Sequence, residues 1–221
     1  YGSSTPVAPR SVIILFIALL FGLATPFGII YLMEILDTTI RGRKDIEDKL
    51  SIPFLGDIPE YHGSTRQGSV VVRDNGRDSV SEAFRLIRSN LGFMSVKSGK
   101  LQIIMVTSSN PHAGKTFVTT NLAMTLALAD KKVVIVDLDL RRRTLSKQMG
   151  QRDNRNGVSG YISGTIANLN DIVFQSGLHE NLDIIFAGLQ PPNPAEMLLS
   201  EKFDEFMADL RKRYDYVVID S

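Results

Sequence analysis

The sequence predicts an α/β fold, in which helices flank a parallel sheet, preceded by one transmembrane helix. The sheet is indicated by four short, almost entirely apolar runs, which begin near residues 101, 133, 182 and 214 and alternate with helical patterns. Strands of that kind are typical of parallel sheets covered on both faces. The transmembrane helix is indicated by an uncharged apolar run over residues 11–33, because about 20 such residues span a bilayer core.

The overall composition excludes several classes of site. Lys and Arg number 25 against 24 Asp and Glu, and the resulting net charge of +1 argues against a dedicated nucleic-acid binder. The chain has no cysteine, which excludes disulfides and cysteine-based metal sites. Its 3 histidines are far apart in sequence, so a histidine metal cluster is not expected. We also expect a piece of a longer protein, because the chain begins at Tyr1 and stops at Ser221, directly after an apolar run.

We assign the first apolar run to a transmembrane helix over residues 11–36. Pro26 and Gly28 would weaken a soluble helix but are tolerated in membranes. A signal peptide would have a shorter apolar core and a small-residue cleavage site, which leaves a buried hairpin of a soluble core as the alternative. Positive charges gather after the run, so the positive-inside rule places residues 37–221 in the cytoplasm and residues 1–10 outside, as an external juxtamembrane tail.

Residues 37–77 are expected to form a cytoplasmic juxtamembrane segment and linker. The stretch 37–50 has the pattern of a short amphipathic helix, and the Gly-, Ser- and charge-rich stretch 61–77 reads as a linker or a loosely docked strap.

A compact domain, truncated at its carboxyl end, is expected over residues 78–221. Ser79 and Glu82 have the spacing of a capping box, which predicts a helix over residues 80–94.

A phosphate-binding loop is predicted between the first strand and the helix that follows it. Residues 108–116 read SSNPHAGKT, which is the pattern G-x-x-x-x-G-K-[ST] with Ser109 in the first Gly position. In such a loop the backbone N–H groups cradle phosphates; Gly114 permits close approach, Lys115 reaches the β- and γ-phosphates, and the Thr116 hydroxyl binds Mg²⁺. The strand, loop and helix occur together, which argues against a chance match. The expected nucleotide-binding residues here are Ser109, Asn110, Pro111, His112, Ala113, Gly114, Lys115, Thr116 and Phe117.

Acidic residues end two of the predicted strands. Residues 133–141 read VVIVDLDLR, and Asp137 and Asp139 stand two apart, so their side chains face the same way in a strand. Residues 217–220 read VVID and end at Asp220. Because ligands of open α/β sheets bind at the carboxyl ends of strands, we expect these acids near the nucleotide. A strand-end cap is the simpler role for each acid taken alone.

The chemistry expected of this site is phosphoryl transfer. One of the paired aspartates would hold Mg²⁺ and the other would take a proton from an incoming hydroxyl. Arg141 is expected to reach phosphate or a neighbouring subunit. The expected catalytic residues are Lys115, Asp137 and Asp139, and the expected metal ligands are Thr116, Asp137, Asp139 and Asp220.

Together these motifs resemble those of the bacterial tyrosine kinases, the cytoplasmic part of polysaccharide co-polymerases that control the length and export of capsule and exopolysaccharide chains. The resemblance rests on the P-loop at 108–116, the h-h-h-D-x-D-x-R run at 133–141 and the h-h-h-D run at 217–220, all after a transmembrane helix. It implies a P-loop NTPase-like fold, ATP and Mg²⁺ as cofactors, and autophosphorylation of tyrosines.

The resemblance also implies partners and a location. These are the bacterial inner membrane, a ring-shaped homo-oligomer in which a neighbour's tyrosine-rich tail is the substrate, the polysaccharide polymerase and export machinery, and a cognate tyrosine phosphatase, but no nucleic acid. Glu82, Arg85 and Arg88 match the E-x-x-R-x-x-R helix with which the family builds its ring. From the residues alone, an exposed intrahelix ion pair is the simpler and favoured account of this spacing, whereas the resemblance favours the ring.

Departures from the family pattern leave other functions open. Arg143 stands where many members have Pro, and the tyrosine-rich tail is not in this chain; Tyr214 and Tyr216 belong to a predicted core strand. One rival is an ATPase of the septum-site or plasmid-partition kind, although these carry a lysine where Asn110 stands here. The other rival is a scaffold in which nucleotide only sets the assembly state.

Overall fold

The computed structural model describes residues 11–37, 42, 44, 46, 52–61, 70–98, 101–111, 113–150 and 156–221. The chain falls into two units, Tyr1–Phe54 and Leu55–Ser221. The expected external tail, residues 1–10, and most of the expected amphipathic helix over residues 37–50 lie outside the described residues. The domain limits given above therefore stay predictions.

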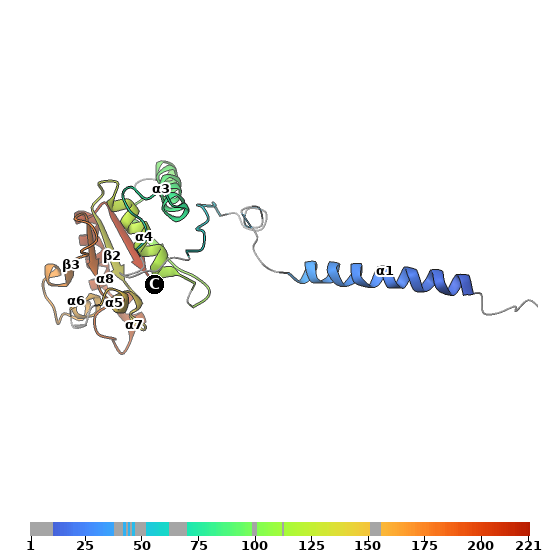
Figure 1. Ribbon diagram of the computed structural model, residues 1–221. Coiled ribbons are helices and arrows are strands. Elements are labelled where there is room, and N and C mark those ends of the chain that lie inside the picture. Colours follow the sequence, from blue (N-terminus) through green and yellow to red (C-terminus); the bar gives the residue numbers. More distant parts are fainter. Residues whose placement is uncertain are drawn as a thin grey trace, which may run out of the picture. The chain divides into compact units, whose positions relative to one another are not determined.

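Helix α1 (Ser11–Leu36) carries the first apolar run (Figure 1). Its segment Val12–Leu36 has 25 residues and a mean hydropathy of 2.6, so its length and composition would allow it to cross a membrane. Pro26 lies inside the helix, where it cannot donate a backbone hydrogen bond. The helix continues through this position, and the neighbouring Thr25 hydroxyl donates to the carbonyl oxygen of Phe21 over 2.6 Å.

The second unit is built on a five-stranded sheet in the order β1-β5-β2-β4-β3. Its strands are β1 (Ile103–Val106), β2 (Val133–Asp137), β3 (Val173–Gln175), β4 (Leu182–Ile185) and β5 (Tyr216–Asp220). The four strands expected from the apolar runs are present and pair in parallel. The expected parallel sheet is therefore present, and β3 adds an antiparallel edge strand to β4. β3 has only three residues, Val-Phe-Gln, which is too short for a periodic pattern to reveal the strand.

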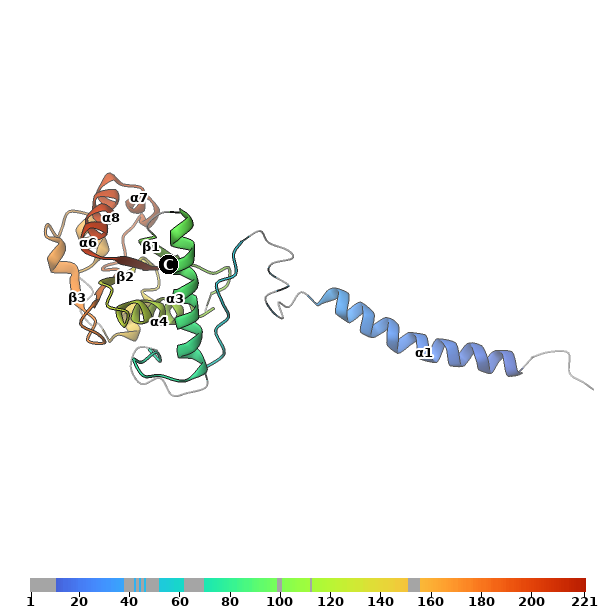
Figure 2. The same ribbon diagram turned by 90° about the horizontal axis from the view of Figure 1, so that it is seen from above.

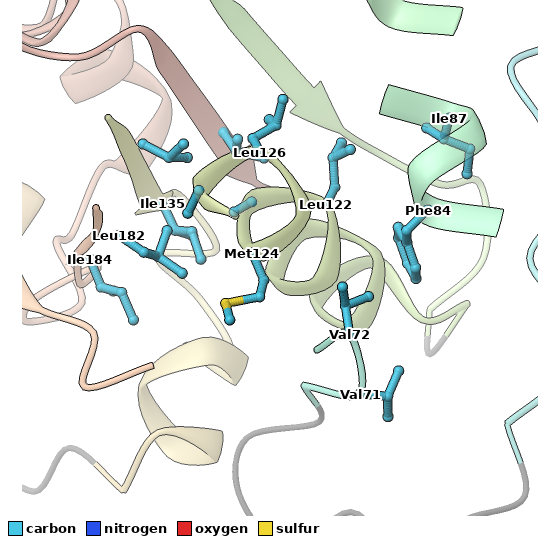
Figure 3. Packing of buried hydrophobic residues seen from close by; sticks show 14 of the residues in the cluster. Val71, Val72, Phe84, Ile87, Leu122, Met124, Leu126, Ile135, Leu182 and Ile184 are labelled. Atoms are coloured by element: carbon cyan, nitrogen blue, oxygen red, sulfur yellow. The ribbon is translucent and has the colours of Figure 1, made fainter. Parts of the chain in front are cut away.

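Helices cover both faces of the sheet (Figures 1 and 2). They are α3 (Ser79–Ser98), α4 (Lys115–Ala127), α5 (Thr144–Gln148), α6 (Val158–Ile162), the 3₁₀ helix η1 (Leu169–Ile172), α7 (Pro194–Leu198) and α8 (Glu201–Arg213). Alternate residues of β2 face opposite ways: Val133 and Ile135 pack with α4 and α3 (Figure 3), whereas Val134 and Val136 pack with α6 and α8. The sheet thus has the two covered faces that its apolar strands predict.

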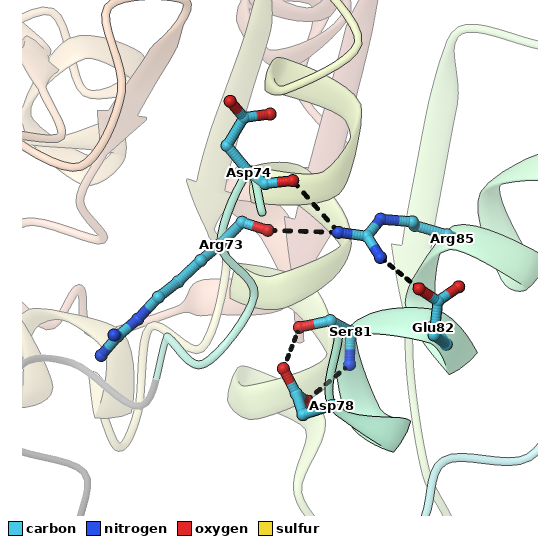
Figure 4. A network of polar contacts seen from close by, with 6 residues as sticks. All are labelled: Arg73, Asp74, Asp78, Ser81, Glu82 and Arg85. Carbon is cyan, nitrogen blue, oxygen red and sulfur yellow. Dashed lines mark hydrogen bonds and ion pairs between the residues drawn. The ribbon is translucent and has the colours of Figure 1, made fainter. Parts of the chain in front are cut away.

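Helix α3 begins differently from the expectation. The predicted capping box at Ser79 and Glu82 is wrong, because Asp78 caps the helix instead. The Asp78 carboxylate accepts hydrogen bonds from the Ser81 backbone N–H over 2.9 Å and from the Ser81 hydroxyl over 2.6 Å (Figure 4). An Asp is as strong an N-cap as a Ser, and the two hydrogen bonds lower the pKa of Asp78. Glu82 is thereby left to pair with Arg85.

Residues 70–77, the described end of the stretch expected to be a linker or a loosely docked strap, are docked on the domain. Val71 is 9% exposed and Val72 is 1% exposed, and both backbone N–H groups donate to the side-chain oxygen of Asn121 in α4, over 2.8 and 3.1 Å. We call residues 70–77 the strap. It packs beside Phe84 of α3 (Figure 3). Its buried hydrogen bonds anchor the segment directly to the helix that follows the P-loop.

Candidate active site

The phosphate-binding loop ends in a backbone suited to an anion. Gly114 has a φ of 86°, in the left-handed region that favours glycine, and a Cβ there would meet nothing within 4 Å. Helix α4 starts at Lys115 without a side-chain cap, so the N–H groups of its first turn have no intrahelical acceptor. Exposed amides at a helix N-terminus, together with the helix dipole, favour phosphate.

Thr116 and Asp220 join the start of α4 to the end of β5. The Thr116 hydroxyl donates to the Asp220 carboxylate over 2.7 Å, and the Thr119 hydroxyl donates to its other oxygen over 3.3 Å. Asp220 is only 1% exposed. Burial raises its pKa, whereas the hydrogen bonds from the two threonines favour its charged form. The expected metal ligands Thr116 and Asp220 are therefore neighbours.

The paired aspartates have different surroundings. Asp137 is fully buried at the end of β2, beside Asp220 in the strand register, and accepts hydrogen bonds from the Asp139 N–H over 3.1 Å and from the Ser146 hydroxyl over 3.3 Å. Burial, followed by the charge of Asp220, raises the pKa of Asp137 to about 7. Asp139 lies beyond the strand, where it accepts hydrogen bonds from the Arg142 N–H and the Thr144 hydroxyl.

A cavity of about 240 Å³ lies at the carboxyl edge of the sheet. Its lining residues are Ala113, Gly114, Lys115, Thr116, Phe117, Asp139, Arg142, Thr144, Gln148, Asp220 and Ser221. Seven of the expected site residues therefore line one space: five of them come from the P-loop and the start of α4, and the other two are Asp139 and Asp220.

The remaining predicted site residues lie elsewhere. Ser109, Asn110 and Pro111 do not line this cavity, and His112 lies outside the described residues. The expectation that Asp137 reaches the cavity like Asp139 is wrong, because the chain turns after Asp137 and leaves its side chain buried behind the lining. Arg141 is exposed and does not line the cavity either. Sequence spacing misses Arg142, Thr144 and Gln148, since their positions follow from the turn after Asp139.

The donor set fits a nucleotide carrying Mg²⁺. Lys115 is the first residue of α4, and its ammonium is 3.3 Å from the Ser108 hydroxyl. No group of three or more Asp, Glu, His or Cys residues that would hold a metal alone occurs in the described part of the chain. Mg²⁺ that binds with a nucleotide takes one or two protein oxygens together with oxygens of the phosphates. Thr116, Asp139 and Asp220 offer such oxygens at the cavity.

Comparison with known proteins identifies the family. Residues 101–221 match the family described as AAA domain. The structure superposes on the kinase domain of the Escherichia coli tyrosine kinase ETK with a TM-score of 0.72 and 29% identity, covering 82% of this chain and 73% of that one. It superposes on the BceF tyrosine kinase domain with a TM-score of 0.69 and 32% identity, covering 82% and 76%. The chain belongs to the bacterial tyrosine-protein kinases.

The match to this kinase family extends in sequence over almost the whole chain. Tyrosine-protein kinase ptk of Acinetobacter johnsonii is 27% identical over 98% of the chain and 30% of its own length. The chain thus spans about a third of the length of the curated kinases whose match covers almost all of it. The sequence-based resemblance to this family and the predicted P-loop NTPase-like fold are confirmed.

The three residues of α3 that the resemblance assigns to ring contacts form hydrogen bonds and an ion pair within this chain. The Arg85 guanidinium pairs with Glu82 and donates to the carbonyl oxygens of Arg73 and Asp74, over 3.4 and 3.2 Å (Figure 4). Arg88 donates to the carbonyl oxygen of Thr125 in α4 over 2.9 Å. The intrahelix pair named above as the simpler alternative is formed. The role of these residues in a ring stays a prediction.

Proposed function

We propose that this protein is an ATP-dependent protein-tyrosine autokinase, tethered to the bacterial inner membrane by α1 with its kinase domain in the cytoplasm. The observation that carries the proposal is the cavity in which Lys115, Thr116, Asp139 and Asp220 come together at a P-loop. Membership of a family of tyrosine-protein kinases supports the choice of tyrosine as the acceptor.

Each residue has a role in the proposed transfer of the γ-phosphoryl group. The amides at the start of α4 and Lys115 hold the phosphates, and Thr116 and Asp220 hold Mg²⁺, with Asp137 buried behind them. Bound Mg²⁺ supplies charge neutralisation of the transferring group. Asp139 accepts the proton of the incoming tyrosine hydroxyl. Catalysis of this kind is mainly positioning and electrostatic stabilisation.

The wider proposal concerns the protein's partners. The acceptor tyrosines belong to the tyrosine-rich tail of a neighbouring subunit in a ring-shaped homo-oligomer, in which Glu82, Arg85 and Arg88 contact the next copy. Phosphorylation regulates a polysaccharide polymerase and export machinery and is reversed by a cognate tyrosine phosphatase. These roles are carried over from the kinase family.

The test is phosphotyrosine formation by the full-length protein in a lipid nanodisc with ATP and Mg²⁺. We expect phosphotyrosine on the protein itself, detected by mass spectrometry, at a rate that rises with protein density in the membrane. Release of inorganic phosphate without any phosphotyrosine would instead favour a membrane-tethered ATPase. Nucleotide binding with neither product would favour a chain-length scaffold.

A further inference from the structure

Arg142 presents a second cation to the candidate active site. It is the residue after Arg141, the arginine expected from the sequence pattern, yet Arg142 lines the cavity and Arg141 does not. Within the described residues, the Arg142 guanidinium takes part in no hydrogen bond or ion pair. By contrast, Arg85 and Arg88 are both occupied by acceptors in their own chain. A guanidinium without a partner at a phosphate-binding cavity is available to a ligand.

The turn that carries Arg142 is organised by Asp139. The Asp139 carboxylate accepts the Arg142 backbone N–H over 2.9 Å, and the Asp139 carbonyl oxygen accepts the Arg143 N–H over 2.9 Å. The Thr144 hydroxyl lies 3.3 Å from the second carboxylate oxygen. Arg143 adopts a φ of 53°, a left-handed conformation that is uncommon and costly for a residue other than glycine. The backbone is thus held in an unfavourable turn that places Arg142 beside Asp139.

The balance of charged residues around the cavity indicates what Arg142 can bind. Its charged lining residues are the cations Lys115 and Arg142 and the acids Asp139 and Asp220. If the two acids serve Mg²⁺ and the incoming hydroxyl, Lys115 and Arg142 are the two cations that the described lining offers to the oxygens of a triphosphate. Lysine acts as a point charge, whereas the planar arginine fork binds two phosphate oxygens at once.

We infer that Arg142 binds the γ-phosphate of ATP and makes this site prefer ATP to ADP. The inference rests on the proposed function, since it takes the cavity to be the ATP site. In a P-loop, the backbone amides at the start of the helix bind the α- and β-phosphates of the nucleotide. Arg142 is instead bonded through its backbone to Asp139, the acid proposed to receive the acceptor proton, and the γ-phosphate is the group that must lie there.

The experiment compares the affinity of ADP with that of a non-hydrolysable ATP analogue, both with Mg²⁺, for the full-length protein in nanodiscs. Arg142→Ala should weaken the analogue by about tenfold, the effect of one charged hydrogen-bonded contact, and leave ADP within about twofold. Arg142→Lys should restore part of the difference. Lys147→Ala is the matched control, because Lys147 is an exposed cation of α5 that does not line the cavity, and it should change neither affinity.

Two results would overturn the inference: an equal loss of ADP and analogue affinity in Arg142→Ala, or unchanged affinity for both. Thermal melting of each variant shows whether it is folded. Recovery of analogue affinity in Arg142→Lys then separates a lost contact from a folding defect. Failure of the proposed function looks different. A wild-type protein that prefers the analogue through Arg142 but forms no phosphotyrosine would leave this inference standing and refute the kinase.

Discussion

The hydroxyl of Thr116 donates a hydrogen bond to the carboxylate of Asp220 over 2.7 Å and so connects the two motifs of the candidate site. One residue belongs to the first turn of α4 and the other ends β5, 104 positions later in the chain. Mg²⁺ entering this site would meet a hydroxyl and a carboxylate already in contact. The pair would therefore need to rearrange little on binding, which lowers the cost of assembling the site.

Asp139→Asn should impair phosphoryl transfer more than nucleotide binding. The amide oxygen of asparagine still accepts the N–H group of Arg142, which keeps the turn, but an amide cannot take a proton. We expect the phosphotyrosine rate to fall by about 10²- to 10³-fold, the usual contribution of a general base, with ATP affinity changed less than about threefold. Stopped-flow nucleotide titration beside the kinase assay measures both. Equal losses would show that Asp139 serves binding rather than proton transfer.

Asp137 should make the stability of the nucleotide-free protein fall as pH rises. Its pKa is raised from the ordinary 3.8 to about 7 by burial and by Asp220, so between those values the folded state binds more protons than the unfolded state. The stabilisation is therefore complete below pH 3.8 and is lost as pH rises through 7, on the order of 4 kcal/mol for this group.

The measurement is thermal unfolding of the full chain without Mg²⁺ between pH 5 and 8. Asp137→Asn is the control: its amide oxygen can accept the Asp139 N–H, its amide NH₂ can donate to the Ser146 hydroxyl, and it does not titrate. The difference in stability between the two proteins should shift in favour of the variant as pH rises. A difference that stays flat across this range would mean that Asp137 titrates at an ordinary pKa.

Asn121→Leu should release the strap from α4. The substitution leaves the Val71 and Val72 amides without their buried acceptor, at a cost of about 1–3 kcal/mol for each unsatisfied group. We expect a lower melting temperature and faster hydrogen exchange at those two amides. Asn193→Ala should change little, since within the described ranges that exposed side chain donates a single hydrogen bond, to Glu196. Unaltered exchange at residues 71 and 72 would contradict the strap's dependence on Asn121.

Simultaneous replacement of Glu82, Arg85 and Arg88 by alanine should reduce the size of the oligomer. Analytical ultracentrifugation of the full-length protein in detergent measures it. Lys202→Ala is a suitable control, because it breaks a similar exposed pair with Glu205 on α8. An unchanged sedimentation coefficient would show that these residues serve only the contacts within their own chain and contradict their role in the ring. Glu82→Ala alone should cost only a few tenths of a kcal/mol in stability, as expected for an exposed helical pair.

The sequence was most informative about features that a single local pattern determines. The four parallel strands follow from apolar runs, and the convergence of Lys115, Thr116, Asp139 and Asp220 follows from the rule that parallel strands present their carboxyl ends at one edge. Prediction from the sequence failed for side-chain positions that depend on a turn or on a partner distant in the chain. The turn after Asp137 buries that residue and brings Arg142 rather than Arg141 to the cavity, and only the folded chain shows that Asn121 holds the strap.

Calorimetric titration of the full-length protein with ATP measures whether a nucleotide with Mg²⁺ binds at the P-loop. We expect Mg²⁺-dependent binding at one site per chain that is lost in Lys115→Met, because methionine keeps the length of the side chain and removes its charge. Wild-type protein that binds no ATP in excess Mg²⁺, or a Lys115→Met variant that binds as tightly as wild type, would contradict it.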